Sequence, residues 1–442
     1  MILSWLNLLS VSSPAAKPNM IEPETPFGKQ FREKYFPNLD KEVYPVNHGS
    51  YGLTPKPVHD KYLQAITENA AYPDKFLKYD QKHAYVAALK ILGQVLNCDY
   101  HNLAIVDNAT TGVNTCLRSY PFKKGDSIVI QSTVYGACGN TVKFLKDNFG
   151  IEFHVVDLEY PVSDKDILQG FEDKFKKFRP ALCMFDTISS MPGVIFPHKQ
   201  MVQLCKKYNV LSLIDGAHGI GCIPQNLDLL KPDFYVSNLH KWFYVPFGCA
   251  VLYVDPKHHR NIHTLPISHS YLSADVELPG EQQKNRLIDR FFFTGTKNFA
   301  SIQVIPDAHE FRQTICGGER TIYDYCHNLA VDAGNLVSKK WGTQVLDSKD
   351  STLISTMVTV EVPTNEFPSV VEKWSSIDDA VYRRCMGQYK AYTPCLAHNG
   401  KLWARFSAQV YNELSDYEVA SDVLLKVLKE VSAELGLLAG KQ

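Results

Sequence analysis

The chain has 442 residues and a formal net charge of −1 at pH 7, with 45% hydrophobic and 21% charged residues. This length suffices for two domains of ordinary size, and the near-neutral balance without long charged runs argues against nucleic acid or an anionic membrane as the main partner. Eleven scattered cysteines without a C-x-x-C pair favour free thiols in a reducing, cytoplasmic compartment over disulfides or a zinc site, so we predict no metal.

The first residues contain the apolar run "ILSWLNLL", which is too short to span a bilayer and has no positive charge before it. No other segment of the sequence approaches transmembrane length. We expect residues 1–19 to be a disordered extension, with Met20 as an alternative start. A signal for secretion or organelle import is the alternative that the sequence leaves open.

Helical and β-rich segments alternate between about residues 56 and 255. Seven short runs are rich in apolar and β-branched residues, and they lie at 103–107, 127–131, 152–157, 181–186, 210–215, 233–238 and 249–254. Amphipathic segments separate them, such as 199–209. Apolar strands separated by helices predict an α/β fold with a mostly parallel sheet that is buried on both faces.

The pattern changes after about residue 300. A helical stretch, two β-rich runs and a final helix follow at 301–315, at 351–362, at 401–412 and from Asp416. Runs of strands followed by a helix predict a smaller α+β domain. We therefore expect a large domain at 56–310 and a small C-terminal domain at 311–442, with a small-molecule site in the cleft between them.

Polar side chains follow the first two predicted strands at the point where each strand ends. "NATTGVN" places Asn108, Thr110 and Thr111 at the expected start of a helix, which suits a phosphate group, although a plain N-cap is the alternative reading. Tyr135 follows the second strand, where core packing is the alternative role. Ligands of open α/β sheets bind at the carboxyl ends of the strands, so these residues are candidates for a site.

Two charged residues occupy the ends of later strands. Asp215 ends the apolar run "VLSLID", and His218 follows it by three residues. Lys241 lies in "VSNLHKWFYVPFGCAVLYV", between two runs that are expected to be buried strands. A buried ammonium group is costly unless it is paired or chemically occupied, so this lysine needs a partner.

Pyridoxal 5′-phosphate would use all of these groups. Its aldehyde forms a Schiff base with a lysine, and its ring nitrogen pairs with a carboxylate such as Asp215. Its phosphate suits hydroxyl groups at a helix N-terminus, and its ring suits an aromatic face. A Schiff base on Lys241 would also remove the cost of burying an ammonium group.

The motifs "NATTGVN", "DGAH", "SNLHKW" and "FTGT" occur in an order that resembles the class V aminotransferase family of fold-type I pyridoxal-phosphate enzymes. The resemblance spans about residues 44–412. "VNHGSYG" and "ARFSAQVYN" are similar to the branch of isopenicillin N epimerase-like proteins and hercynylcysteine sulfoxide lyases. The resemblance to this family implies a fold-type I architecture, with residues 20–55 contributing to the site.

The resemblance implies a role for each matching residue around the cofactor. Lys241 would form the Schiff base, Asp215 would hold the ring nitrogen and Tyr135 would stack on the ring. The remaining cofactor contacts would come from Thr110, Thr111, Ser237 and His240 at the phosphate and from His218 near the phenolic oxygen. Thr296 would reach the phosphate of a neighbouring subunit, which implies a homodimer.

The resemblance also implies a substrate side of the site. Arg405 would clamp the α-carboxylate of an amino acid, because two parallel donors match the two carboxylate oxygens. Asn47, Ser50 and Tyr51 would line the substrate. His48 and Tyr135 are the candidate proton donors to the leaving group.

These inferences favour a lyase that cleaves a C–S bond by β-elimination, acting on a cysteine-derived sulfoxide or conjugate such as hercynylcysteine sulfoxide in ergothioneine biosynthesis. An epimerase, racemase or aminotransferase of the same family is the alternative, since these reactions share their first steps. A cysteine desulfurase is disfavoured because neither Cys316 nor Cys326 lies in a Ser/Gly-rich loop. A non-catalytic binding protein and a nicotinamide enzyme are also disfavoured, since the lysine and aspartate are present and G-x-G-x-x-G is not.

Overall fold

A computed structural model describes residues 22–437 of the chain. The extension expected at residues 1–19 lies outside these described residues. Within them, no helix combines the length and the apolar character needed to cross a membrane, and no group of three or more His, Cys, Asp or Glu side chains could hold a metal ion.

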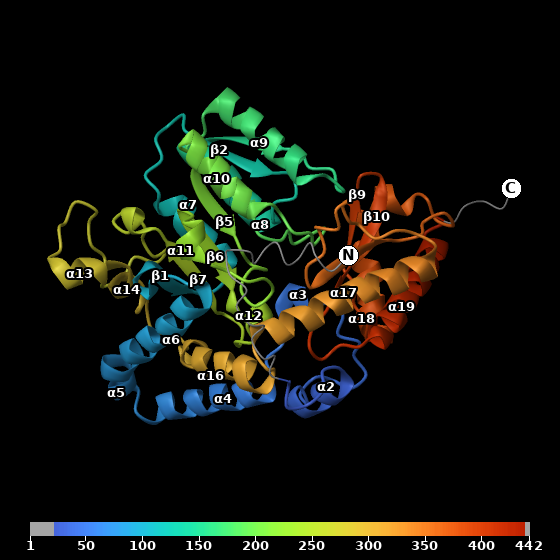
Figure 1. Cartoon of the computed structure of the whole chain (residues 1–442), viewed down its shortest axis with the longest axis horizontal. Helices are drawn as coiled ribbons and strands as arrows, with labels where there is room; N and C mark the ends of the chain where they lie inside the picture. The colour runs from blue at the N-terminus through green and yellow to red at the C-terminus, as the bar shows by residue number, and fades with distance from the viewer. Residues whose placement is uncertain (1–21, 438–442) are drawn as a thin grey trace, which may run out of the picture.

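A seven-stranded sheet forms the centre of the larger part of the molecule (Figure 1). Its strands are β1 Leu103–Val106, β2 Ser127–Gln131, β3 Glu152–Val156, β4 Leu182–Asp186, β5 Leu211–Asp215, β6 Phe234–Asn238 and β7 Ala250–Val254. The spatial order is β1-β7-β6-β5-β4-β2-β3, and only the pairs that involve β7 are antiparallel. Each predicted strand is present, and the predicted α/β fold with a mostly parallel sheet is confirmed.

Helices follow the strands and cover the sheet (Figure 1). Between residue 56 and β7, the α-helices are α4 Lys56–Ala71, α5 Pro73–Lys75, α6 Gln81–Leu96, α7 Ala109–Ser119, α8 Gly136–Phe149, α9 Asp164–Phe178, α10 His198–Tyr208, α11 Leu227–Leu230 and α12 Leu239–Trp242. The amphipathic segment at 199–209 is α10, which buries Met201, Val202 and Cys205 against the sheet side.

Short helices connect the large sheet to the C-terminal part. They are α13 Gly280–Lys284, α14 Arg286–Phe291, α15 Ala300–Gln303, α16 Ile305–Glu310 and a π-helical turn at Phe311–Ile315. The helical stretch predicted at 301–315 is therefore present but divided. Pro306 lies in the first turn of α16, where its missing N–H costs no helical hydrogen bond, and this placement explains the break after α15.

The C-terminal elements form a second group beside the large sheet (Figure 1). They are α17 Glu319–Trp341, β8 Met357–Glu361, α18 Val370–Tyr389, β9 Cys395–His398, β10 Lys401–Ser407 and α19 Leu414–Glu434. The three strands form an antiparallel sheet in the order β8-β10-β9. This arrangement agrees with the predicted α+β character, while the domain boundaries at 56 and 310 stay predictions.

Two details of the small sheet differ from the expectation. The strand predicted from residue 351 begins only at Met357, because the Asp347 side chain accepts the backbone N–H of Leu353 and holds the preceding residues in a loop. The strand β9 was not predicted. It is joined to β10 by Asn399 and Gly400, which both have positive φ angles of 50° and 70°, the typical two-residue hairpin turn.

The N-terminal segment joins the two groups of elements. It contains α2 Lys29–Tyr35 and α3 His48–Tyr51, and α3 lies between α12 and the C-terminal helices (Figure 1). Tyr44 forms a parallel bridge with Ala391 of the small part. Gly52 has a φ of +84°, and a Cβ atom there would lie 1.9 Å from the carbonyl oxygen of His240. The backbone of this segment thus lies directly on α12.

Candidate active site

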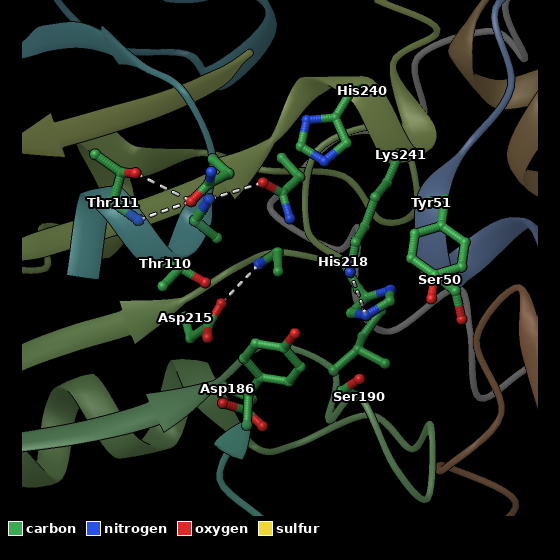
Figure 2. Close-up of a pocket in the computed structure, with 16 residues that line it drawn as sticks. Ser50, Tyr51, Thr110, Thr111, Asp186, Ser190, Asp215, His218, His240 and Lys241 are labelled. Carbon is green, nitrogen blue, oxygen red and sulfur yellow. Dashed lines mark hydrogen bonds between the residues drawn. The ribbon is translucent and has the colours of Figure 1, made fainter. Parts of the chain in front are cut away.

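A cavity of about 470 Å³ opens at the carboxyl ends of the central strands. Its walls include most of the residues predicted for a site, namely Ser50, Tyr51, Thr110, Thr111, Tyr135, Asp215, His218, His240 and Lys241. Figure 2 shows Lys241 extending from α12 toward His218, with Ser50 and Tyr51 on one side and Asp215 with Thr110 on the other. The rule that ligands bind at the strand ends of an open α/β sheet therefore located this cavity.

Lys241 is partly buried, and it forms no salt bridge with any residue between 22 and 437. Its Nζ atom lies 3.2 Å from Nε2 of His218. Burial and the positive charge of Arg405 lower the pKa of Lys241 to about 8, although Asp215 opposes the shift. At this pKa about a tenth of the lysine is neutral amine at pH 7 and about half at pH 8, far more than for an ordinary lysine, and the neutral amine is the form that a nucleophile or a general base requires.

Asp215 is buried and holds its carboxylate at the end of β5, facing the cavity. One carboxylate oxygen accepts the backbone N–H of Ala217 at 3.0 Å, and the other accepts the thiol of Cys138 at 3.3 Å. These two donors fix the orientation of the carboxylate. Each oxygen keeps a second lone pair that can receive a proton donor from the cavity.

The N-terminus of α7 forms another wall of the cavity. Asn108 is the N-cap of this helix, and its Oδ1 atom accepts the backbone N–H of Thr111 at 2.8 Å, as the plain N-cap reading expected. Oδ1 of Asn238 accepts the N–H of Ala109 at 2.8 Å. The same helix end turns Thr110 and Thr111 toward the cavity (Figure 2), so hydroxyl groups and a helix dipole meet where an anion would be stabilised.

Arg405 lies behind the cavity wall on β10, with an exposed fraction of 2%. One Nη atom donates to Oδ1 of Asn47 at 2.9 Å and to Oγ of Ser50 at 2.8 Å, and the other donates to the carbonyl oxygen of Ser190. All three acceptors are uncharged, and within residues 22–437 no carboxylate forms a salt bridge with this guanidinium. Burial lowers the pKa of Arg405 to about 10, and its Nε atom has no hydrogen-bond partner among the described residues.

Gly193 permits this placement of Arg405. Its φ is +77°, and a Cβ atom there would lie 2.7 Å from Cδ of Arg405. Any larger residue would therefore have both an unfavourable backbone conformation and a steric clash with the arginine.

His48 is buried beside the site but does not line the main cavity. Its Nε2 atom lies 2.7 Å from the backbone oxygen of Lys241, and its Nδ1 atom lies 2.7 Å from the hydroxyl of Tyr411. A carbonyl can only accept, so Nε2 carries the proton and Nδ1 accepts from Tyr411. Both ring nitrogens are thus occupied, and burial lowers the pKa of His48 to about 3. This geometry does not support the predicted role of proton donor and makes His48 a structural link between α3 and α12.

Three other predicted residues also lie outside the wall of this cavity: Asn47, which lines a neighbouring cavity, and Ser237 and Thr296. The hydroxyl of Ser237 donates to the carbonyl oxygen of Gly216 and accepts the N–H of Ile220 at 3.0 Å, so it stabilises the turn after β5. Its side chain is fully buried, and the predicted phosphate contact is not supported by these bonds. Thr296 is exposed and does not line the cavity, so its proposed contact with a neighbouring subunit stays a prediction.

Three polar wall residues were not predicted as site residues from the sequence: Asp186, Ser190 and Asn238. Asp186 ends β4 and is paired in register with Asp215. Burial and the neighbouring charge of Asp215 raise the pKa of Asp186 well above its usual range, while Gln131 donates to it at 2.7 Å. A signal existed, because "ALCMFD" ends an apolar strand in an aspartate just as "VLSLID" does.

The chain matches the family model of aminotransferase class-V over residues 53–416. The chain belongs to this family. The hercynylcysteine sulfoxide lyase of Schizosaccharomyces pombe is 30% identical over 90% of this chain and 97% of its own length. The L-cysteine desulfhydrase-like protein lolT2 of Epichloe uncinata is 30% identical over 93% and 96%. The isopenicillin N epimerase of Streptomyces clavuligerus is 23% identical over 74% and 82%.

Solved structures confirm the fold of this class-V chain. A mutant of C-DES with glycine covalently linked to its PLP cofactor superimposes with a TM-score of 0.72 at 17% identity, covering 90% of this chain and 98% of that structure. The cysteine desulfurase CsdA of Escherichia coli gives a TM-score of 0.67 at 17% identity, covering 91% and 98%. The family and fold-type I architecture inferred from the motifs are therefore both confirmed.

Proposed function

We propose that this class-V protein binds pyridoxal 5′-phosphate through Lys241 and cleaves the C–S bond of an S-substituted cysteine derivative. The observation that carries the proposal is a pair of buried or partly buried cations without a carboxylate partner among the described residues: Lys241 lines the cavity, and Arg405 lies behind its wall against Ser50 and Ser190. Buried cations without an anion are costly, so a ligand that brings an anionic group and an aldehyde would compensate both.

The chemistry of the cavity wall fits the cofactor. Lys241 would hold it covalently, the Asp215 carboxylate would hold the ring nitrogen, and Tyr135 would face the ring. The N-terminus of α7 with Thr110 would hold the phosphate, in the way that helix N-termini hold anions. When bound, the cofactor would supply an electron sink for the negative charge that develops at the substrate Cα atom.

Arg405 would bind the α-carboxylate of the substrate. Asn47 and Ser50 hold the guanidinium from one side, and the unpartnered Nε atom shows that its donor capacity is not exhausted. An amino-acid carboxylate would provide the missing negative charge through two parallel hydrogen bonds. The amino group of the same substrate would then lie toward Lys241.

Proton transfer would be divided between two residues. Lys241, with its lowered pKa, would remove the proton from Cα once the substrate has taken its place. Tyr135 lies at the start of α8 with an exposed fraction of 48%, and its hydroxyl is the better candidate to protonate the leaving sulfur group, because both nitrogens of His48 are occupied.

A second cavity supports a substrate that is larger than cysteine. It has a volume of about 270 Å³, adjoins the first at Tyr51 and is lined mainly by apolar and aromatic side chains, including Val43, Tyr44, Tyr392 and Tyr411. A bulky substituent on the sulfur atom would fill this space, whereas free cysteine would leave it empty. The Schizosaccharomyces pombe relative is named as a lyase of hercynylcysteine sulfoxide, which is a cysteine derivative with a bulky substituent of this kind.

None of the residues that line the main cavity is a cysteine, and ten of the eleven cysteines are buried. A cysteine desulfurase needs a cysteine nucleophile at the substrate sulfur, so this arrangement favours elimination. An epimerase or aminotransferase would use the same Lys241 and Arg405 and stays the alternative.

The reaction is tested by incubating the purified protein with L-cysteine, S-alkyl cysteines and bulky cysteine sulfoxides, and by measuring all products. We expect pyruvate and ammonia in equal amounts, with the highest kcat/KM for the bulky sulfoxide. An amino acid of inverted configuration would establish an epimerase, and a keto acid that keeps its sulfur would establish an aminotransferase. Either result without pyruvate would refute the lyase.

A further inference from the structure

Trp242 follows Lys241 directly and makes a buried hydrogen bond with His218. The indole Nε1 atom lies 3.1 Å from Nδ1 of His218, and both residues have an exposed fraction of 1%. An indole N–H can donate but cannot accept. Nδ1 of His218 must therefore be the acceptor, so a neutral His218 carries its proton on Nε2.

The position of the indole is fixed from several sides. A Cβ atom on Gly49 would lie 3.1 Å from the Trp242 ring, and one on Gly221 would lie 2.5 Å from its backbone oxygen. Arg312 donates to that same oxygen at 2.7 Å. The close packing leaves Trp242 little freedom to turn its N–H away from His218.

The other nitrogen of His218 faces the lysine. Nε2 lies 3.2 Å from Nζ of Lys241 (Figure 2). If Nε2 carries the proton, it can only donate, and a neutral lysine amine is the form that accepts. A protonated lysine has no lone pair and would bring N–H groups of both residues against each other.

We propose that Trp242 is a positioning residue that fixes His218 as the Nε2–H tautomer and thereby holds Lys241 as the neutral amine. The order of donation runs from Trp242 to His218 and from His218 to Lys241. The neutral amine can attack the cofactor aldehyde with its lone pair, and the aldehyde oxygen then leaves as water with the two amine protons. The inference rests on Lys241 as the cofactor-binding lysine.

The charges around His218 act in the same direction. The groups that face it are Lys241 from α12, Arg405 from β10 and His48 from α3, while Asp215 ends the preceding strand. Burial first, and then the positive charge of Arg405, lower the pKa of His218 well below its usual value, and Lys241 adds to this shift only while it is protonated. His218 therefore stays neutral, and only the choice between its two tautomers remains for Trp242 to make.

The tautomer is tested by ¹⁵N NMR of histidine in the full-length, cofactor-free protein, with the His218 signal assigned by its loss in His218→Leu. We expect the proton on Nε2 and no titration between pH 6 and 9. A proton on Nδ1, or titration within that range, would overturn the inference even if every Trp242 variant failed to fold.

The coupling to Lys241 is tested by the pH midpoint at which the full-length protein, freed of cofactor, captures pyridoxal 5′-phosphate, trapped by borohydride. In Trp242→Phe, His218 can place its proton on Nδ1 and accept from a protonated lysine. The midpoint should therefore rise by about one pH unit, or about tenfold in proton affinity, as expected for one buried hydrogen bond.

Two controls separate positioning from a general structural effect. Trp403→Phe also removes a buried indole donor, which bonds the oxygen of His398 at 3.0 Å in the small sheet, and it should leave the midpoint unchanged. In the His218→Leu background, Trp242→Phe should add no further shift. An equal shift with and without His218, or no shift from Trp242→Phe in the protein that keeps His218, would refute the inference. Capture of the cofactor by Lys241→Ala would refute the lysine assignment instead.

Discussion

Two buried arginines lie near α12, Arg312 at the backbone oxygen of Trp242 and Arg405 near Lys241, and they differ in how their charge is compensated. Arg312, behind α12, forms two hydrogen bonds of 2.6 Å with the carboxylate of Glu319 and is fully buried. Burial alone would lower the pKa of Arg312, but Glu319 raises it above its usual value. Arg405, beside the cavity, has only uncharged acceptors, and its pKa is lowered to about 10.

Two other buried guanidinium groups of this fold are held in different ways: Arg312 by a carboxylate, and Arg290 by several backbone carbonyl oxygens. Arg405 differs from both because it lies beside the cavity. Arg405 and Lys241 have no carboxylate partner among residues 22–437; Lys241 lines the cavity, and Arg405 bonds two residues of its wall, Ser50 and Ser190. We therefore expect an anionic ligand to supply the negative charge that these two cations lack. Variants of the residues compared above test this expectation.

The largest effect is expected for Lys241→Ala. The variant should lose covalent attachment of the cofactor and, with it, catalysis by on the order of a thousandfold or more, because no other group supplies the nucleophile. Borohydride reduction followed by peptide mass analysis measures the attachment. A pyridoxyl adduct on another lysine with retained activity would contradict the assignment of the site.

Arg312→Met should lower the free energy of unfolding by about 3 kcal/mol, since it leaves the Glu319 carboxylate, whose side chain is 24% exposed, without its partner. Urea unfolding of the variant and the wild-type protein measures the change. Replacing both residues, as in Arg312→Met with Glu319→Leu, should recover most of this loss. An unchanged stability would show that the pair is not structural.

Arg405→Met should leave stability within about 1 kcal/mol of the wild type, because it removes a buried charge that lacks an anion. It should raise KM by about thirty- to a thousandfold through loss of a charge-assisted contact worth about 2–4 kcal/mol. The cofactor absorbance should be retained. If saturation by every amino-acid substrate is unchanged, the carboxylate binds elsewhere.

The pH dependence of stability should reveal the lowered pKa of Lys241 in the cofactor-free protein. Between pH 8 and 10.5 the unfolded lysine still binds a proton that the folded lysine has lost, so stability rises with pH in this window. Relative to Lys241→Met, the wild type should gain about 3 kcal/mol from pH 7 to pH 10.5, measured by urea unfolding. A constant difference would mean that the lysine is not desolvated.

The smallest effect is expected for Thr296, whose predicted contact is with the cofactor site of a second subunit. If this exposed residue completes the phosphate site of a second subunit, Thr296→Ala should weaken cofactor binding by about fivefold, the equivalent of one hydrogen bond. Sedimentation should show a dimer at the same time. Full cofactor affinity in a monomeric protein would remove this prediction.

Local patterns in the sequence accounted for the large sheet and for the position of the cavity. The strands of this sheet are short apolar runs, so burial on both faces was encoded in each segment separately. The hairpin turn at Asn399 and Gly400 is encoded just as locally, but it was not predicted from the sequence. Its strand β9 has only four residues, which is too short for a clear alternation.

The motifs of the sequence determined the family, and residue type with position after a strand made Lys241 and Asp215 candidates, because both can be read along the chain. Arg405, inside β10, became a candidate through the resemblance to the family. Only the tertiary structure decided which groups compensate each charge. Arg312 pairs with Glu319, Nδ1 of His48 accepts a hydrogen bond from Tyr411, and Trp242 of α12 donates to His218, which follows β5. These outcomes depend on distances of a few ångströms between separate elements, and hydrogen bonds distinguish a structural group from a reactive one only at that scale.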